Sequence, residues 1–190
     1  MGEAAELEFD YEELKRLIKE QAFLRDDEGG FTLASGRVSN YLFDLKPLLL
    51  DPKGSNLISK GIYERIKDLN AGYVGGLESG AIPIVTALCM YSWKREKQFY
   101  GFFVRKEGKA HGVKKRIVGN FVENENVIIV EDVTTTGGSV INAVKAVRDK
   151  GCSVVKVISI VDRLEGAMEN FHKEGIEFES LFTRKDFGIQ

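Results

Sequence analysis

Apolar positions along the chain follow two patterns, and in its second half these patterns alternate. Short continuous apolar runs are typical of strands buried on both faces, whereas apolar residues repeating every three or four positions are typical of helices. The runs predict strands at about 71–76, 99–104, 127–130, 154–161 and 178–182, and the helical spacing predicts helices at about 80–93, 134–150 and 164–173. This repetition predicts an α/β fold with a mostly parallel central sheet, helices on both faces and right-handed crossovers.

The first seventy residues are organised differently. Apolar spacing predicts helices at about 10–24 and 55–69. The first of these begins at Asp10 with a sequence that resembles a capping box. Between them lie two short extended segments at 31–37 and 41–45, joined at Gly36, and then turns at Pro47 and at 51–54. No stretch resembles a linker, so we expect residues 1–190 to form a single domain.

Composition excludes several classes of protein. The chain has 190 residues, of which 43% are hydrophobic and 29% charged, and its net charge of −2 argues against nucleic-acid binding. No apolar run approaches the ~20 residues that span a membrane, and the acidic N-terminus does not resemble a signal peptide. We therefore expect a cytoplasmic protein that binds neither membrane nor nucleic acid, with Cys89 and Cys152 as buried free thiols. His111 and His172 have no partner at metal-ligand spacing, so no protein metal site is expected.

The most informative stretch runs from Val127 to Ser139. A buried strand is followed by the carboxylates Glu131 and Asp132, and then by three threonines and two glycines that lead into a helix. Ligands bind at the carboxyl ends of strands in open α/β sheets, and such a turn at a helix N-terminus can hold a phosphate. The carboxylates can accept hydrogen bonds from a vicinal diol such as ribose. The stretch predicts a sugar-phosphate site; the alternative is an ordinary polar turn.

A basic loop at about 105–119 interrupts the apolar pattern. It carries one acidic residue, Glu107, one histidine, His111, three glycines, and six basic residues: Arg105, Lys106, Lys109, Lys114, Lys115 and Arg116. Because it leaves a strand at the same sheet edge as the threonine turn, we expect a lid that excludes water from a polyphosphate. The alternative is a solvated charged loop.

Two further turns and two lone cations are weaker candidates. The glycine-rich turn at 75–80 could hold a pyrophosphate, although tight packing would explain its glycines equally well. Arg163, after another strand, offers a fork for a planar carboxylate, or alternatively forms an ion pair that caps a helix. Arg37 and Lys46 are expected at the surface.

Five pieces of the sequence match one family in order: FTLASGRVSNYLFDLKP, GGLESGAIP, VRKEGKAHG, EDVTTTGGS and DRLEG. They span residues 31–166, and through them the chain resembles the orotate branch of the type I phosphoribosyltransferases. EDVTTTGGS is typical of the whole superfamily, whereas the lid piece and DRLEG favour the orotate branch. The chain departs from many members at Ala34 and at Glu78-Ser79, where they carry lysines, and Lys46 is a candidate to replace one of these.

The resemblance implies a reaction and a set of roles. Phosphoribosyl pyrophosphate (PRPP) would react with orotate to give orotidine 5′-monophosphate and pyrophosphate, with Mg²⁺ held mainly by PRPP. The implied catalytic residues are Lys109, Glu131 and Asp132, and Thr135 and Arg163 would bind orotate. The implied PRPP-binding residues are Arg105, Lys106, Lys109 and His111 at the pyrophosphate, Glu131 and Asp132 at the ribose, Thr134, Thr135, Thr136, Gly137, Gly138 and Ser139 around the 5-phosphate, and Val133 in the same motif.

The resemblance also implies an N-terminal hood over the base, at about 25–50, and a homodimer whose lid residues serve the neighbouring subunit.

Three alternative functions stay open. A transferase for a purine base would keep the PRPP site and change the hood and Arg163. A non-catalytic PRPP-sensing regulator would need a nucleic-acid-binding surface, which the net charge disfavours. A structural relic is disfavoured because both the lid and the carboxylates remain.

Overall fold

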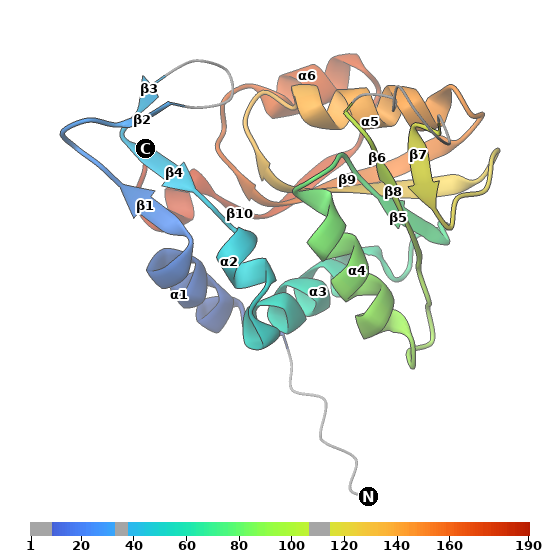
Figure 1. Ribbon diagram of the computed structural model, residues 1–190, viewed down its shortest axis with the longest axis horizontal. Coiled ribbons are helices and arrows are strands. Elements are labelled where there is room, and N and C mark those ends of the chain that lie inside the picture. The colour runs from blue at the N-terminus through green and yellow to red at the C-terminus, as the bar shows by residue number, and fades with distance from the viewer. Residues whose placement is uncertain (1–8, 33–37, 107–114) are drawn as a thin grey trace, which may run out of the picture.

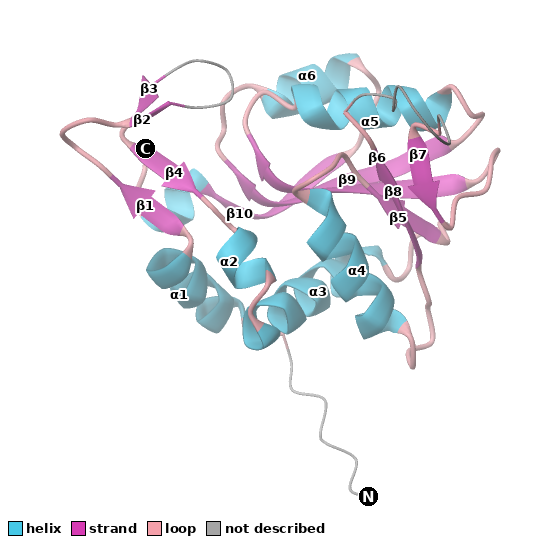
Figure 2. Ribbon diagram, viewed as in Figure 1, coloured by secondary structure: helices cyan, strands magenta, loops and turns pink. Residues whose placement is uncertain are grey.

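A six-stranded sheet forms the centre of the computed structural model, which describes residues 9–32, 38–106 and 115–190 (Figures 1 and 2). Its strands are β5 (Tyr73–Gly75), β6 (Tyr100–Val104), β7 (Ile117–Gly119), β8 (Asn126–Thr134), β9 (Ser153–Asp162) and β10 (Phe178–Thr183). Their order is β10-β9-β8-β5-β6-β7. All neighbouring pairs are parallel except β6 and β7, which are antiparallel. The predicted mostly parallel sheet is confirmed.

Helices cover both faces of this sheet (Figure 1). One face carries α5 (Gly138–Arg148) and α6 (Ala167–Lys173), and the other carries α3 (Pro52–Ile66) and α4 (Ala81–Ser92), next to which lie α1 (Tyr11–Gln21) and α2 (Lys46–Leu49). Strand β8 separates two apolar clusters because successive side chains of a strand point to opposite faces. Ile128 and Val130 belong to the cluster of α3 and α4, whereas Val127 and Ile129 belong to that of α5.

The N-terminal part adds two small antiparallel sheets beside the carboxyl edge of the central one. Strand β1 (Phe23–Arg25) pairs with β4 (Tyr41–Phe43), and β2 (Phe31–Thr32) pairs with β3 (Val38–Ser39). We call these four strands the hood. The rings of Phe23 and Phe43 both pack on Phe187, in a 3-10 helix (η1, Arg184–Phe187) near the C-terminus, so the two chain ends support one another.

Several predicted boundaries in this part are wrong. The first helix ends at Gln21, and Phe23 instead begins β1. Pro47 lies inside the short helix α2, where a turn was predicted. The predicted turn at 51–54 is the start of α3: the Asp51 carboxylate accepts the Gly54 N–H at 2.8 Å, and Pro52 occupies the first helical position, where its missing N–H costs nothing.

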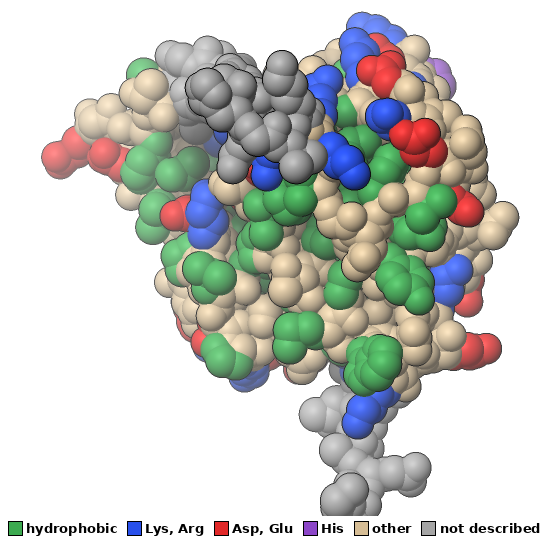
Figure 3. All heavy atoms as spheres, turned by 45° about the vertical axis from the view of Figure 1, so that its right-hand side comes forward, with side chains coloured by type: hydrophobic (Ala, Val, Ile, Leu, Met, Phe, Trp, Pro, Cys, Tyr) green, Lys and Arg blue, Asp and Glu red, His purple; other side chains and the backbone are tan. Residues whose placement is uncertain are grey.

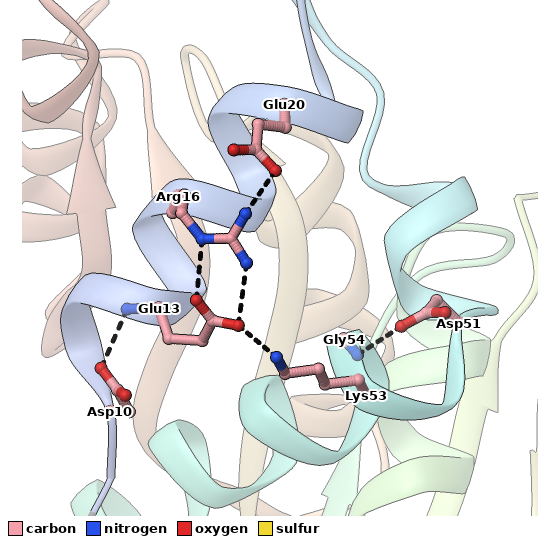
Figure 4. A network of polar contacts seen from close by, with 7 residues as sticks. All are labelled: Asp10, Glu13, Arg16, Glu20, Asp51, Lys53 and Gly54. Carbon is pink, nitrogen blue, oxygen red and sulfur yellow. Dashed lines mark hydrogen bonds and ion pairs between the residues drawn. The ribbon is translucent and has the colours of Figure 1, made fainter.

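Helix α1 begins as its sequence predicts and is tied to α3 by charge (Figure 4). The Asp10 carboxylate accepts the Glu13 N–H at 2.9 Å. The Glu13 side chain accepts hydrogen bonds from Arg16, with Nε 2.8 Å away, and from Lys53 of α3. These bonds, the Arg16 bond first, lower the pKa of Glu13 to about 2.

Candidate functional site

Strand β8 carries the two carboxylates at the sheet edge. It runs to Thr134, beyond the predicted end at 130, so Glu131 and Asp132 lie within the strand rather than after it. Their side chains interact with one another. Glu131 is 7% exposed and sits opposite Ser159 of β9, whereas Asp132 is half-buried.

The environment of Glu131 favours its protonated form. Burial is the main cause that raises its pKa well above the usual value, and the neighbouring charge of Asp132 adds to it. One Glu131 oxygen accepts the Asp132 N–H at 3.2 Å, and the charge of Lys106 opposes the shift. A protonated carboxyl both donates and accepts, so Glu131 suits a partner that does the same, such as a sugar hydroxyl.

The glycine-rich turn at 75–80 packs directly on the end of β8. A Cβ at Gly80 would lie 2.6 Å from an Asp132 carboxylate oxygen, and one at Gly76 would lie 2.3 Å from the Val130 carbonyl oxygen. Packing therefore accounts for these two glycines, which was one of the two interpretations of this turn. The Glu78–Ser79 peptide bond is cis, and a Glu78 oxygen accepts the Lys106 N–H at 3.1 Å, which joins the turn to the start of the lid.

The threonine turn leads from β8 into α5. Thr134 is 1% exposed, Thr135 is half-buried, and Thr136 is exposed. Gly137 precedes α5 with φ of +82°, and no side chain caps the helix at this position. The first N–H groups of α5 therefore have no capping acceptor there and, with the helix dipole, favour an anion. Gly138 and Ser139, the first residues of α5, are exposed as an anion site requires.

Arg163 lies directly beside this turn. Its backbone N–H donates to the Thr134 carbonyl at 2.9 Å. Its guanidinium lies over the Tyr41 ring, 4.2 Å from the centroid, and donates from Nη2 to Ser39 Oγ at 3.0 Å. Nε lies 2.8 Å from a Glu165 oxygen, so the predicted ion pair is present as well. Sequence reasoning missed Ser39 and Tyr41 as neighbours of Arg163, because no local signal connects residues more than 120 positions apart.

The ends of the basic loop lie close together. The Arg105 N–H donates to the Arg116 carbonyl at 2.9 Å, and residues 117–119, predicted as part of the loop, form β7. The predicted lid of 105–119 is therefore too long at its C-terminal end. Lys and Arg side chains gather on the upper part of the face in Figure 3. Of the remaining candidates, Lys109, His111 and Lys114 lie outside the described residues, as do Ala34, Gly36 and Arg37.

A cavity of about 780 Å³ lies away from the threonine turn, between β7 and the second half of α5. Arg105 and Arg116 line it together with the acidic Glu123 and Asp149, and Glu123 pairs with Lys150 at 2.9 Å. Its mixed charge makes it a weaker anion site than the start of α5.

The other sequence-based candidates are placed as follows. Lys46 pairs with Asp44 at the surface, with Nζ 3.2 Å from a carboxylate oxygen. Cys89 and Cys152 are free thiols; Cys152 is buried as predicted, whereas Cys89 is only half-buried.

Within residues 9–32, 38–106 and 115–190, no group of three or more His, Cys, Asp or Glu side chains could hold a metal ion. No helix in the same ranges is long and apolar enough to cross a membrane.

Comparison with known proteins gives one consistent result. A family model described as "Phosphoribosyl transferase domain" matches residues 61–182. The chain is 45% identical to the orotate phosphoribosyltransferase of Bradyrhizobium diazoefficiens over 178 residues, which cover 92% of this chain and 94% of the relative. It is 46% identical to that of Aquifex aeolicus over 171 residues, which cover 90% of this chain and 93% of the relative.

Solved structures agree with this result. The crystal structure of orotate phosphoribosyltransferase from Mycobacterium tuberculosis H37Rv in complex with PRPP superposes with a TM-score of 0.78 at 35% identity, covering 94% of this chain and 99% of that one. The adenine phosphoribosyltransferase of Leishmania donovani, at 17% identity and a TM-score of 0.65, covers 91% of this chain and 80% of that one, and shares the fold.

Proposed function

Since this chain belongs to the phosphoribosyltransferase family, in its orotate branch, we propose that it transfers the phosphoribosyl group of PRPP to orotate. The products are orotidine 5′-monophosphate and pyrophosphate, in pyrimidine biosynthesis. The observation that carries this proposal is the bond between the Arg163 N–H and the Thr134 carbonyl. It brings a guanidinium fork for a carboxylate and a helix N-terminus for a phosphate to one sheet edge.

We assign PRPP to the threonine turn. Its 5-phosphate binds at the start of α5, and its ribose hydroxyls face Glu131 and Asp132. Arg105 and Lys106, which follow β6, are placed beside the glycine-rich turn by the contact of Lys106 with Glu78 and are assigned to the pyrophosphate. Lys109 and His111 share that role by family resemblance. The full PRPP-binding set is Arg105, Lys106, Lys109, His111, Glu131, Asp132, Val133, Thr134, Thr135, Thr136, Gly137, Gly138 and Ser139.

Catalysis on this assignment is mainly positioning and neutralisation of charge. The departing pyrophosphate is highly anionic while positive charge develops on the sugar. The catalytic residues are Lys109, Glu131 and Asp132: the basic lid, through Lys109, stabilises the pyrophosphate, Asp132 stabilises the positive sugar, and Glu131 holds the ribose hydroxyls by hydrogen bonds. When bound with PRPP, Mg²⁺ would add positive charge at the pyrophosphate. We assign this ion to PRPP oxygens rather than to protein side chains. No protein nucleophile is needed.

The base assignment is tested with a panel of orotate, adenine and hypoxanthine, each supplied with PRPP and Mg²⁺ and followed by ultraviolet absorbance. We expect turnover of orotate alone. Arg163→Ala should raise KM for orotate at least tenfold, since a charge-assisted fork contributes about 1.5–3 kcal/mol, and should leave KM for PRPP nearly unchanged. Turnover of a purine without orotate would instead support the purine transferase, and no turnover with tight PRPP binding would support the regulator.

The role of Asp132 is tested by Asp132→Asn. Asp132 is half-buried at the sheet edge, so the substitution should impair PRPP binding or turnover while leaving the melting temperature of the ligand-free protein almost unchanged. A large fall in that temperature would assign Asp132 a structural role instead.

We also propose a homodimer, and an apolar surface around α4 supports it. We define the α4 face by Met90 and Trp93, which are 76% and 66% exposed. Hollows of about 600 and 340 Å³ flank Met90, one toward the start of α3 and one toward β6 and β7. Hydrophobic side chains are spread over the face shown in Figure 3. Exposed apolar surface between two hollows fits a symmetric contact with a second copy, in which each Met90 enters a hollow of the other.

The dimer is tested by Met90→Glu with Trp93→Glu. These changes should convert a dimer to a monomer in sedimentation equilibrium, because they would bury charge without a partner. Met168→Glu is the matched control, since Met168 is also exposed but lies on α6, on the opposite side of the sheet. A monomeric wild-type protein, or a dimer insensitive to both changes, would contradict the α4 face as the interface.

Lid sharing is tested by mixing subunits. Lys109→Ala and Asp132→Asn should each nearly abolish activity, and exchange between them should restore some of it. A mixed dimer then holds one site with both defects and one with neither, so recovery reaches at most about a quarter of wild-type sites by symmetry. The strand that leads into the lid, β6, borders the hollow beside Met90, which supports this proposal. No recovery after demonstrated exchange would mean that each lid serves its own subunit.

We place the enzyme in the cytoplasm, where free thiols such as Cys89 and Cys152 persist. Fractionation of cells that produce the tagged chain tests this: activity should follow cytosolic markers and not membranes.

A further inference from the structure

The guanidinium of Arg163 is held by hood residues to which the proposed reaction gives no role. The Arg163 side chain is only 3% exposed. Ser39 of β3 and Tyr41 of β4 contact it from the hood. Arg163 itself follows β9 of the central sheet. The contact therefore joins the hood to the central sheet at the point where the threonine turn begins.

The Ser39 hydroxyl is fully used in this contact. A serine hydroxyl has one proton to donate and two lone pairs to accept with. Ser39 Oγ donates to the Tyr41 carbonyl at 2.9 Å and accepts the Tyr41 N–H at 3.3 Å. The remaining lone pair accepts from Arg163 Nη2 at 3.0 Å. Because the local bonds to Tyr41 fix the direction of the Ser39 proton, Ser39 can act toward Arg163 only as an acceptor.

The Tyr41 ring supplies the second contact. It is 6% exposed, it lies 4.2 Å from the guanidinium carbon, and the rings of Phe23 and Phe43 pack around it. The negative face of an aromatic ring attracts a guanidinium, and the attraction grows when both are buried. The Tyr41 hydroxyl is buried and has no hydrogen-bond partner among the described residues. The ring, rather than the hydroxyl, is therefore the part that acts on Arg163.

We propose that Ser39 and Tyr41 are positioning residues that hold the Arg163 guanidinium in one orientation for the carboxylate of the base. The inference rests on the proposed role of Arg163 in binding orotate. An arginine side chain is long and flexible, so the contacts with Ser39 and Tyr41, added to the ion pair with Glu165, fix it in advance and reduce the entropy that binding would otherwise cost.

Steady-state kinetics with both substrates varied tests the proposal. Ser39→Ala should raise KM for orotate about tenfold, the effect of losing one hydrogen bond to a charged group, with KM for PRPP nearly unchanged. Ser39→Thr, which keeps the hydroxyl, should restore most of the wild-type value. Tyr41→Leu should raise KM for orotate by a similar factor, roughly tenfold, whereas Tyr41→Phe, which keeps the ring, should leave it unchanged.

Tyr63→Leu is the matched control for loss of a buried tyrosine. Tyr63 is 5% exposed and lies 5.8 Å from the Arg95 guanidinium, but it belongs to α3. Its loss should lower the melting temperature without changing KM for orotate. Should Tyr41→Leu fail to fold, the serine variants and Tyr41→Phe still decide the question.

Arg163→Ala separates failure of this inference from failure of the proposed function. If Arg163→Ala leaves KM for orotate unchanged, Arg163 does not bind the base, and both the assignment and the inference fail. If it raises KM while Ser39→Ala does not, only the positioning inference is overturned. A fall in KM for orotate in Ser39→Ala would also overturn it, because Ser39 would then compete with the substrate for Nη2.

Discussion

Replacement of Gly137 by alanine should destabilise the protein strongly, whereas the same change one residue later should not. Gly137 has φ of +82°, a conformation that costs a residue with a side chain about 1–2 kcal/mol. A Cβ there would also lie 2.5 Å from the ring of Phe171, which is fully buried in α6 and cannot move freely. Overpacking of this kind costs about 1–3 kcal/mol, so the total loss in unfolding free energy should be about 2–5 kcal/mol.

Gly138 provides the control within the same turn. It is the first residue of α5, its φ is not positive, and no atom lies within 4 Å of a Cβ built on it. Gly138→Ala should therefore change the unfolding free energy by no more than about 0.5 kcal/mol. The higher helix propensity of alanine favours a small increase. Both substitutions fall in the proposed phosphate site, so activity cannot separate them and stability must be measured.

The assay is urea unfolding of the ligand-free protein at one fixed protein concentration. With a slope of roughly 2 kcal/mol per molar urea, Gly137→Ala should lower the midpoint by roughly 1–2.5 M. Adding Phe171→Leu to Gly137→Ala measures the steric part, because the coupling free energy of the double-mutant cycle isolates the clash from the strain in φ. Equal midpoints for Gly137→Ala and Gly138→Ala would refute the reasoning from both the backbone angle and the Phe171 contact.

Two further predictions concern single side chains. Glu131 has a raised pKa in the folded protein, so its contribution to stability is fully present below its unfolded pKa and is lost as the pH rises through the folded value. Glu131→Gln should therefore raise the melting temperature of the ligand-free protein increasingly at higher pH, while lowering activity; a constant difference at all pH values would contradict the shifted pKa. Asp51→Ala should cost about 1 kcal/mol through loss of the cap on the Gly54 N–H, measured by urea unfolding, whereas Asp27→Ala, which removes only an exposed ion pair with Arg25, should cost almost nothing.

The sequence by itself determined the sheet and the chemistry of its edge. Apolar runs such as 127–130 and the helical spacing after them depend on neighbours in the chain, so the order and type of the main elements could be predicted. The EDVTTTGGS turn was equally readable, because a strand, a polar turn and a helix N-terminus are contiguous in sequence. The cap at Asp10 was found for the same reason.

Boundaries were less predictable because they depend on pairing across the sheet. Strand β8 continues through Glu131 and Asp132 since β9 pairs with it as far as Asp162, and the polar residues alone suggested that the strand had ended. Strand β7 was hidden in the basic loop for a related reason: its three residues are held by β6, not by an apolar pattern of their own.

Only the tertiary structure decided the surroundings of Arg163. The sequence offered Arg163 as a fork or as part of an ion pair, and the fold adds the Tyr41 ring and the Ser39 hydroxyl from the hood. It also decided that Gly80 lies against Asp132 and that Gly137 lies against Phe171. Each of these contacts joins segments far apart in the chain, and such contacts form because whole elements pack, not because of any pattern in the residues beside them.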